Sequence, residues 1–213
     1  MKIHTLALTA LIIMIISTTA QASSLQAILG AVRYDNLEID DGSGNAKTID
    51  VSTMPQFGGV WSTTPKGEKL QFGLECSLLA GFNYESATYS VLSSRISVNY
   101  NIWMFDLAGG LYANLFMGKE DRVRIYAAGG PLIMSSILHT YTYQDNNLAD
   151  DNYNYNRESA FGYGLYARTG FEFRIHERGM IGLGIRGTWA ELDLSNTSDL
   201  TGIAAFGTYT FQF

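Results

Sequence analysis

The chain has 213 residues, a formal net charge of −6, and a charged fraction of 16%. An acidic chain without a basic stripe excludes a nucleic-acid-binding surface, and a single cysteine, Cys76, excludes an intramolecular disulfide. The charged fraction is low for a water-soluble domain, in which about a quarter of residues are charged.

The first predicted element is a cleaved targeting segment. Lys2 provides a short basic start, an apolar run extends from Leu6 to Ile16, and Ala20 and Ala22 occupy the A-x-A positions of a cleavage site. The run is too short for a membrane-spanning helix, which needs ~20 residues. We therefore predict a signal peptide over 1–22 and one domain over 23–213.

An alternation of apolar and polar residues predicts strands along the rest of the chain. The first two are expected at 25–34 and 54–63, and the third begins at Leu70 after a turn at 64–68. From Leu70 to Tyr84 the alternation is interrupted only by Leu79. A continuous apolar face opposite a face that carries Glu75 suits a wall between hydrocarbon and a polar lumen.

The segment 95–117 has an apolar set whose phase slips by one residue. Up to Ile102 the even-numbered positions are apolar, and from Phe105 the odd-numbered positions are. We predict a one-residue bulge near Trp103-Met104, which makes 95–117 one long strand paired with 69–91. The alternative is two short strands, which raises the strand count from eight to ten.

Further strands are expected at 122–143, with a bend or bulge at 129–131, and at 159–175, 180–191 and 200–213. Longer loops at 35–53, 143–158 and 192–199 alternate with short turns. An even strand count places both chain termini on the periplasmic side, where the turns are short. This favours eight strands.

The closing strand places Tyr209, Phe211 and Phe213 on one face. Together with the signal peptide and the alternating strands, this ending resembles the small Gram-negative outer-membrane β-barrels of the OmpA-transmembrane-domain and OmpX kind. The stretch from Arg124 to Gly130 is also similar to the Tyr-x-x-x-Gly motif of such barrels.

This resemblance implies an all-β, antiparallel up-and-down transmembrane β-barrel in the outer membrane. It implies contact with outer-membrane lipid and lipopolysaccharide, with periplasmic chaperones and with the barrel-assembly machinery, which would read Tyr209, Phe211 and Phe213 as an assembly signal. We expect a monomer without a cofactor. The family includes structural, adhesive and pore-forming proteins, so the resemblance does not define one function.

The predicted inward faces carry a set of charged residues that are the candidate site. They are Glu75, Asp106, Arg122, Arg124, Arg168, Glu172, Arg174 and Arg186. Side chains fill the interior of an eight-stranded barrel, and buried charges must be paired. We predict a salt-bridged, largely closed lumen with a structural or surface-interaction role. The alternative is a narrow channel for small or apolar solutes, or an anion path lined by the excess of arginine.

Catalytic and metal sites are not expected. Ser135 and His139 share a strand face, but Thr140 and Tyr141 follow His139, so the His-x-Ser pattern of lipid A deacylase barrels is missing. The acidic run 40–45 lacks the spacing of a calcium-binding EF-hand loop. We therefore predict no enzyme activity and no bound metal.

Overall fold

The structure is a computed structural model that describes residues 22–35, 53–91, 94–146, 152–194 and 197–213. The predicted signal peptide, except for Ala22, and most of the predicted loop 35–53 lie outside these residues.

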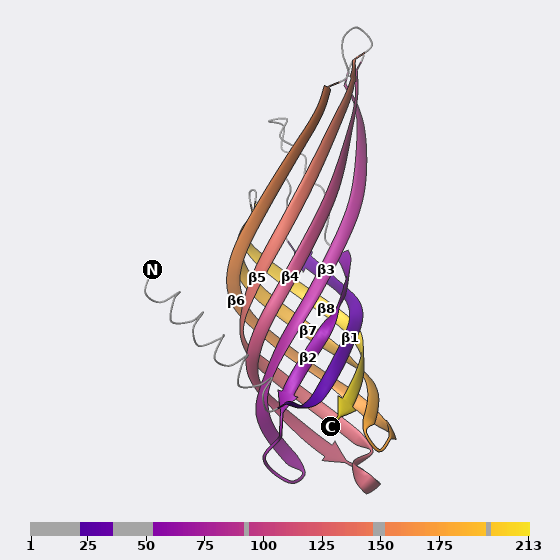
Figure 1. Ribbon diagram of the computed structural model, residues 1–213, viewed down its shortest axis with the longest axis vertical. Helices are drawn as coiled ribbons and strands as arrows, with labels where there is room; N and C mark the ends of the chain where they lie inside the picture. Colours follow the sequence, from indigo (N-terminus) through magenta and orange to yellow (C-terminus); the bar gives the residue numbers. More distant parts are fainter. Residues whose placement is uncertain (1–21, 36–52, 92–93, 147–151, 195–196) are drawn as a thin grey trace, which may run out of the picture.

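The described residues form eight antiparallel strands in sequence order, closed by pairing of the first with the last (Figure 1). This confirms the eight-stranded barrel and excludes the ten-stranded alternative. The strands are β1 (Ala22–Asp35), β2 (Thr53–Thr63), β3 (Leu70–Val91), β4 (Ser94–Met117), β5 (Val123–Asn146), β6 (Asn152–His176), β7 (Gly179–Leu194) and β8 (Thr197–Gln212). A short 3₁₀ turn, η1 (Lys119–Asp121), joins β4 to β5.

The register of the strands defines the width of the barrel. A row of paired residues that starts at Ile125 on β5 and passes once around the barrel returns to β5 at Ser135, ten residues further along. For eight strands this stagger corresponds to a strand tilt of roughly 40°, which leaves an interior just wide enough for side chains to fill.

Within the closed barrel, one face of the strands is mainly apolar and exposed, and the other is buried. Among the most exposed large side chains are Leu29, Leu111, Phe161, Leu165 and Ile203, all of which point outward. A wall of this kind is stable in hydrocarbon, where a closed ladder of strands pairs the backbone N–H and C=O groups with one another. None of the described residues forms a helix long and apolar enough to span a membrane.

The predicted bulge near Trp103-Met104 is wrong. The pairing of β3 with β4 runs from Leu70 and Leu115 to Val91 and Ser94 without a register shift. Tyr100 and Ile102 therefore point into the barrel, where they are buried. Their apolar side chains do not need lipid, because this part of the lumen is itself apolar.

Two further features of the strands differ from the predictions. Pairing between β4 and β5 stops around Gly130-Pro131 and resumes in the same register, so this is an interruption and not a bulge. Much of the predicted loop 143–158 is strand, since β5 continues to Asn146 and β6 begins at Asn152, with Gln144 opposite Asn152. Residues 147–151 lie outside the described part.

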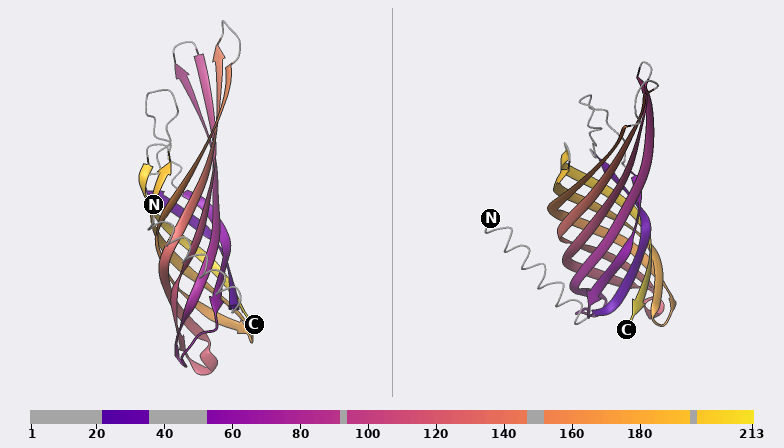
Figure 2. Two further views of the ribbon diagram at one scale, coloured as in Figure 1. Left: turned by 60° about the vertical axis from the view of Figure 1, so that its left-hand side comes forward. Right: turned by 45° about the horizontal axis from the view of Figure 1, so that its top comes forward.

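The strands differ markedly in length. β3 to β6 contain 22 to 25 residues each, whereas β1, β2, β7 and β8 contain 11 to 16. The additional residues of the four longer strands lie at one end of the barrel. A four-stranded sheet made of β3 to β6 therefore projects beyond the closed barrel (Figures 1 and 2). We call this part the projecting sheet.

Inside the barrel, large aromatic rings lie over glycines on the neighbouring strand. Directly opposed pairs of this kind include Tyr34 with Gly202, Tyr112 with Gly73, and Tyr126 with Gly170. A Cβ atom added at Gly202 would lie 2.6 Å from the ring of Tyr34, which is buried and has no room to move. The glycines therefore make the space that the lumen tyrosines occupy.

We predict that Gly202→Ala lowers the free energy of unfolding by about 1–3 kcal/mol, because the added methyl group overpacks the lumen. Gly207→Ala is the matched control on the same strand, since its Cβ would have no neighbour closer than 3.8 Å. Urea unfolding in lipid vesicles measures both. Equal stability of the two variants would contradict the packing shown here.

Candidate functional site

The candidate site is the lumen of the barrel, where three ion pairs link different strands. The first joins β6 to β3. Arg168 binds Glu75 through two parallel hydrogen bonds, Nε to Oε1 at 2.8 Å and Nη2 to Oε2 at 2.6 Å. The hydroxyl of Tyr166 donates a third hydrogen bond to Oε1 at 2.9 Å. Glu75 is fully buried, so its charge depends on these partners.

The second pair joins Arg124 of β5 to Glu172 of β6. Oε1 of Glu172 also accepts hydrogen bonds from Thr208 at 2.8 Å, Thr210 at 2.7 Å and Gln26 at 2.6 Å. The amide oxygen of Gln26 in turn accepts a hydrogen bond from the Arg168 of the first pair. The first two pairs therefore form one network that spans the lumen.

The third pair joins Arg186 of β7 to Asp106 of β4, with Nη2 2.8 Å from Oδ1. The guanidinium of Arg186 also lies 4.7 Å from the ring centre of Tyr166. Arg186 is directly opposite Arg168 on the neighbouring strand. Two cations in this position repel each other, so each needs its own carboxylate.

Six of the eight predicted lumen charges are thus brought together, and two are not. Arg122 is 70% exposed at the β4–β5 turn, where it pairs with Glu120. Arg174 lies at the end of the barrel and donates to the backbone carbonyls of Glu177 and Asp121. The six buried charges are three cations and three anions, so the lumen formed by the described residues has no excess of buried arginine to support an anion path.

A second part of the lumen, not predicted from the sequence, is a buried apolar cluster on the side of the projecting sheet. We call it the apolar plug. Its principal members are Val32, Tyr34, Met54, Leu79, Tyr100, Ile102, Met104, Leu132, Met134, Leu138, Leu192 and Leu200. One signal for it was present in the sequence. Leu79, which interrupts the alternation of the third strand, points inward and is fully buried.

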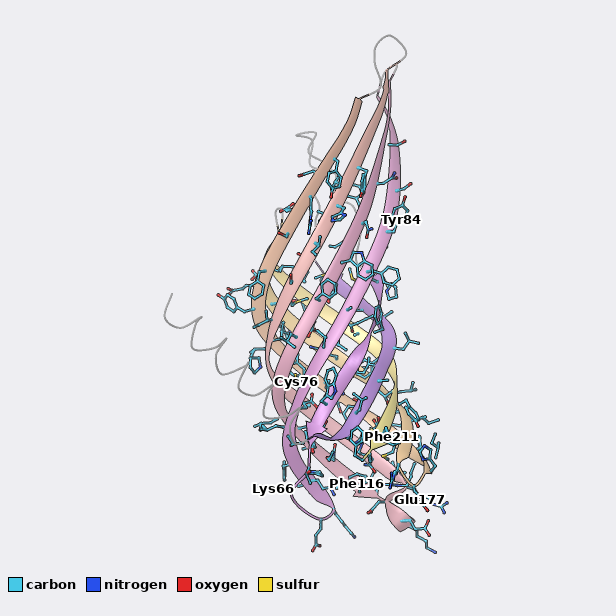
Figure 3. The ribbon with its side chains drawn as sticks, viewed as in Figure 1. Lys66, Cys76, Tyr84, Phe116, Glu177 and Phe211 are labelled. Carbon is cyan, nitrogen blue, oxygen red and sulfur yellow. The ribbon has the colours of Figure 1, made fainter. Side chains whose placement is uncertain are left out.

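Tyr209, Phe211 and Phe213, the predicted assembly signal, lie at the opposite end. They occupy the outward face of β8 and the residue after it, and Phe211 and Phe213 pack edge to face with ring centres 5.3 Å apart. The backbone N–H of Phe213 donates to the carbonyl of Ser23 at 2.9 Å, which extends the closing seam. Figure 3 shows Phe211 at the same end as the turn residues Lys66 and Glu177.

The residues considered for catalysis do not form a nucleophile–base pair. Ser135 and His139 lie on the outward face of β5, and no hydrogen bond joins them in the described part of the chain. The ring of His139 packs instead against Tyr155, with ring centres 5.8 Å apart. The described residues also contain no cluster of three or more His, Cys, Asp or Glu able to hold a metal.

A closed eight-stranded barrel with an apolar outer wall and a paired polar interior defines an integral outer-membrane β-barrel protein, and the chain is one of this class. No protein-family model and no curated protein matches the sequence. Similar solved structures include OprG from Pseudomonas aeruginosa (13% identity, 91% of this chain, 97% of that chain, TM-score 0.46). Another is Ail of Yersinia pestis (12% identity, 90% and 99%, TM-score 0.44). Neisserial surface protein A is also similar (10% identity, 89% and 96%, TM-score 0.42).

We predict that Glu75→Gln destabilises the barrel by about 3–5 kcal/mol, because it leaves Arg168 buried without a counter-charge beside Arg186. Urea unfolding in lipid vesicles measures the change. Glu120→Gln is the control, since its exposed pair with Arg122 is worth well below ~1 kcal/mol. A Glu75→Gln variant as stable as the control would show that the buried pair does not hold the wall together.

Proposed function

We propose that the protein is a closed outer-membrane barrel that acts through its projecting sheet and not through a pore. The observation that carries the proposal is the filling of the lumen. Among Glu75, Arg124 and Arg168 there remains a cavity of about 10 Å³, which has room for about one water. Beyond it, the apolar plug covers the polar network on the side of the projecting sheet.

The projecting sheet supports a surface-interaction role. Its described outward side chains include an aromatic group in which the rings of Tyr141 and Tyr155 lie 5.0 Å apart and His139 packs against Tyr155. Tyrosine provides a large contact area at low cost in side-chain entropy, which suits a recognition surface. A long sheet anchored in a closed barrel also holds this surface away from the membrane.

One observation favours a second function, the passage of small apolar solutes. The apolar plug would solvate such a molecule better than water would. Passage would still require the ion pairs beneath the plug to separate, at a cost of several kcal/mol for each charge left unpaired. For this reason we favour the closed barrel.

The conductance of the purified protein in planar lipid bilayers tests the closed lumen. We predict no reproducible current steps for the native chain, because the three ion pairs and the plug exclude hydrated ions. The double variant Glu75→Ala, Arg168→Ala removes one pair completely and is expected to conduct. Stable channels in the native protein that change when Arg168 or Arg186 is replaced would contradict the proposal.

We also propose that Tyr209, Phe211 and Phe213 are recognised by the barrel-assembly machinery, and that periplasmic chaperones carry the unfolded chain. Their outward position on the closing strand supports this. Deletion of Phe213 is expected to lower the amount of protein in the outer membrane severalfold, as measured by immunoblotting of membrane fractions. Thr201→Ala, outward on the same strand, is the control. Equal levels for both variants would contradict an assembly role.

A further inference from the structure

The barrel has a polar vestibule at the end with the short turns, opposite the projecting sheet. Its volume is about 270 Å³, and it lies between the turns and the buried ion pairs. Figure 3 shows Phe116, which lines it, at the same end of the barrel as the turn residues Lys66 and Glu177. By the topology of the class this end faces the periplasm.

The inner part of the vestibule contains polar side chains with unused hydrogen-bonding capacity. Ser24 and Asn114 are 8% and 7% exposed, and neither side chain forms a hydrogen bond within the described part of the chain. Both line the vestibule and also the small cavity above it. Their hydrogen-bonding groups therefore face this space and can be used by a molecule that enters it.

The charged groups around the vestibule favour an anion. Arg124 forms its inner end, and Nε of this buried guanidinium has no hydrogen-bond partner among the residues that the structure describes. Arg174 lies at the rim, where its acceptors are two backbone carbonyls and the amide oxygen of Gln212 at 3.4 Å. It pairs with no carboxylate among the described residues. Asp121, also at the rim, is the single acidic residue of the lining.

We propose that the vestibule binds a small oxyanion, a carboxylate or a phosphate, from the periplasmic side. Asn114 and Ser24 donate hydrogen bonds to it, and Arg174 supplies the uncompensated positive charge, while Arg124 closes the inner end. Charge-assisted hydrogen bonds of this kind are the usual means by which proteins bind carboxylate and phosphate. The ion pairs above keep the anion from crossing, so this is a binding site and not a path. It does not depend on the role of the projecting sheet.

The test uses the mature full-length barrel in phosphatidylcholine nanodiscs. The side-chain amide signal of Asn114 is followed by NMR while acetate or inorganic phosphate replaces chloride at constant ionic strength. We expect a saturable shift with a millimolar dissociation constant. Repeating the titration in phosphatidylglycerol nanodiscs identifies the source of the phosphate. A signal already shifted there, with no further response, shows that a lipid headgroup occupies the site, whereas an unchanged response shows that a free solute does.

Two arginines at the same end of the barrel give a matched comparison. Arg174→Gln is expected to weaken binding at least fivefold, and Arg122→Gln, whose side chain lies outside the vestibule, to change it less than twofold. Asn114→Asp should abolish binding, and heat-modifiable migration on a gel shows whether this variant folds. The proposal is overturned if no saturable shift occurs relative to chloride, or if both arginine variants weaken binding equally.

Discussion

Three carboxylates and three guanidinium groups lie inside a barrel whose wall faces hydrocarbon, so none of them can reach water by moving outward. Each must be neutralised within the lumen, because an unpaired charge there costs several kcal/mol. This requirement explains why the pairs join β3 to β6, β5 to β6 and β4 to β7. It also explains why Gln26 and Tyr166 lie between them, since the remaining lone pairs and N–H groups need partners as well.

The lumen is divided along its axis into three parts that follow from different sequence features. The vestibule is polar and open towards the short turns, the ion-pair network fills the middle, and the apolar plug lies on the side of the projecting sheet. An apolar interior above a polar one is the arrangement expected of a barrel that blocks water and ions. The functions that we propose lie at the two ends of this lumen, in the projecting sheet and in the vestibule.

Much of the fold could be predicted from the sequence, because period-two alternation is direct evidence of which face meets lipid. The prediction was wrong where both faces are apolar, as at Tyr100 to Met104, since alternation cannot then define a phase. For the candidate site, the alternation shows which charged residues share one face of a strand. It does not show how deep along the barrel axis each of them lies. Arg122 and Arg174 alternate like Arg124, yet they lie at the end of the barrel. Pairing partners such as Glu75 and Arg168 depend on the stagger of the strands, which the sequence does not show.

A closed lumen requires that water is excluded from the half of the barrel that the apolar plug fills. Chemical modification of a cysteine placed there measures this most directly. In a Cys76→Ser background, Ala204→Cys puts the thiol beside the plug, where the native side chain is 3% exposed, and Lys66→Cys puts it in an exposed turn. We predict that a hydrophilic maleimide modifies the turn cysteine within minutes and leaves the plug cysteine unmodified until the barrel is unfolded. Similar rates for both in the folded protein would show that the lumen is open.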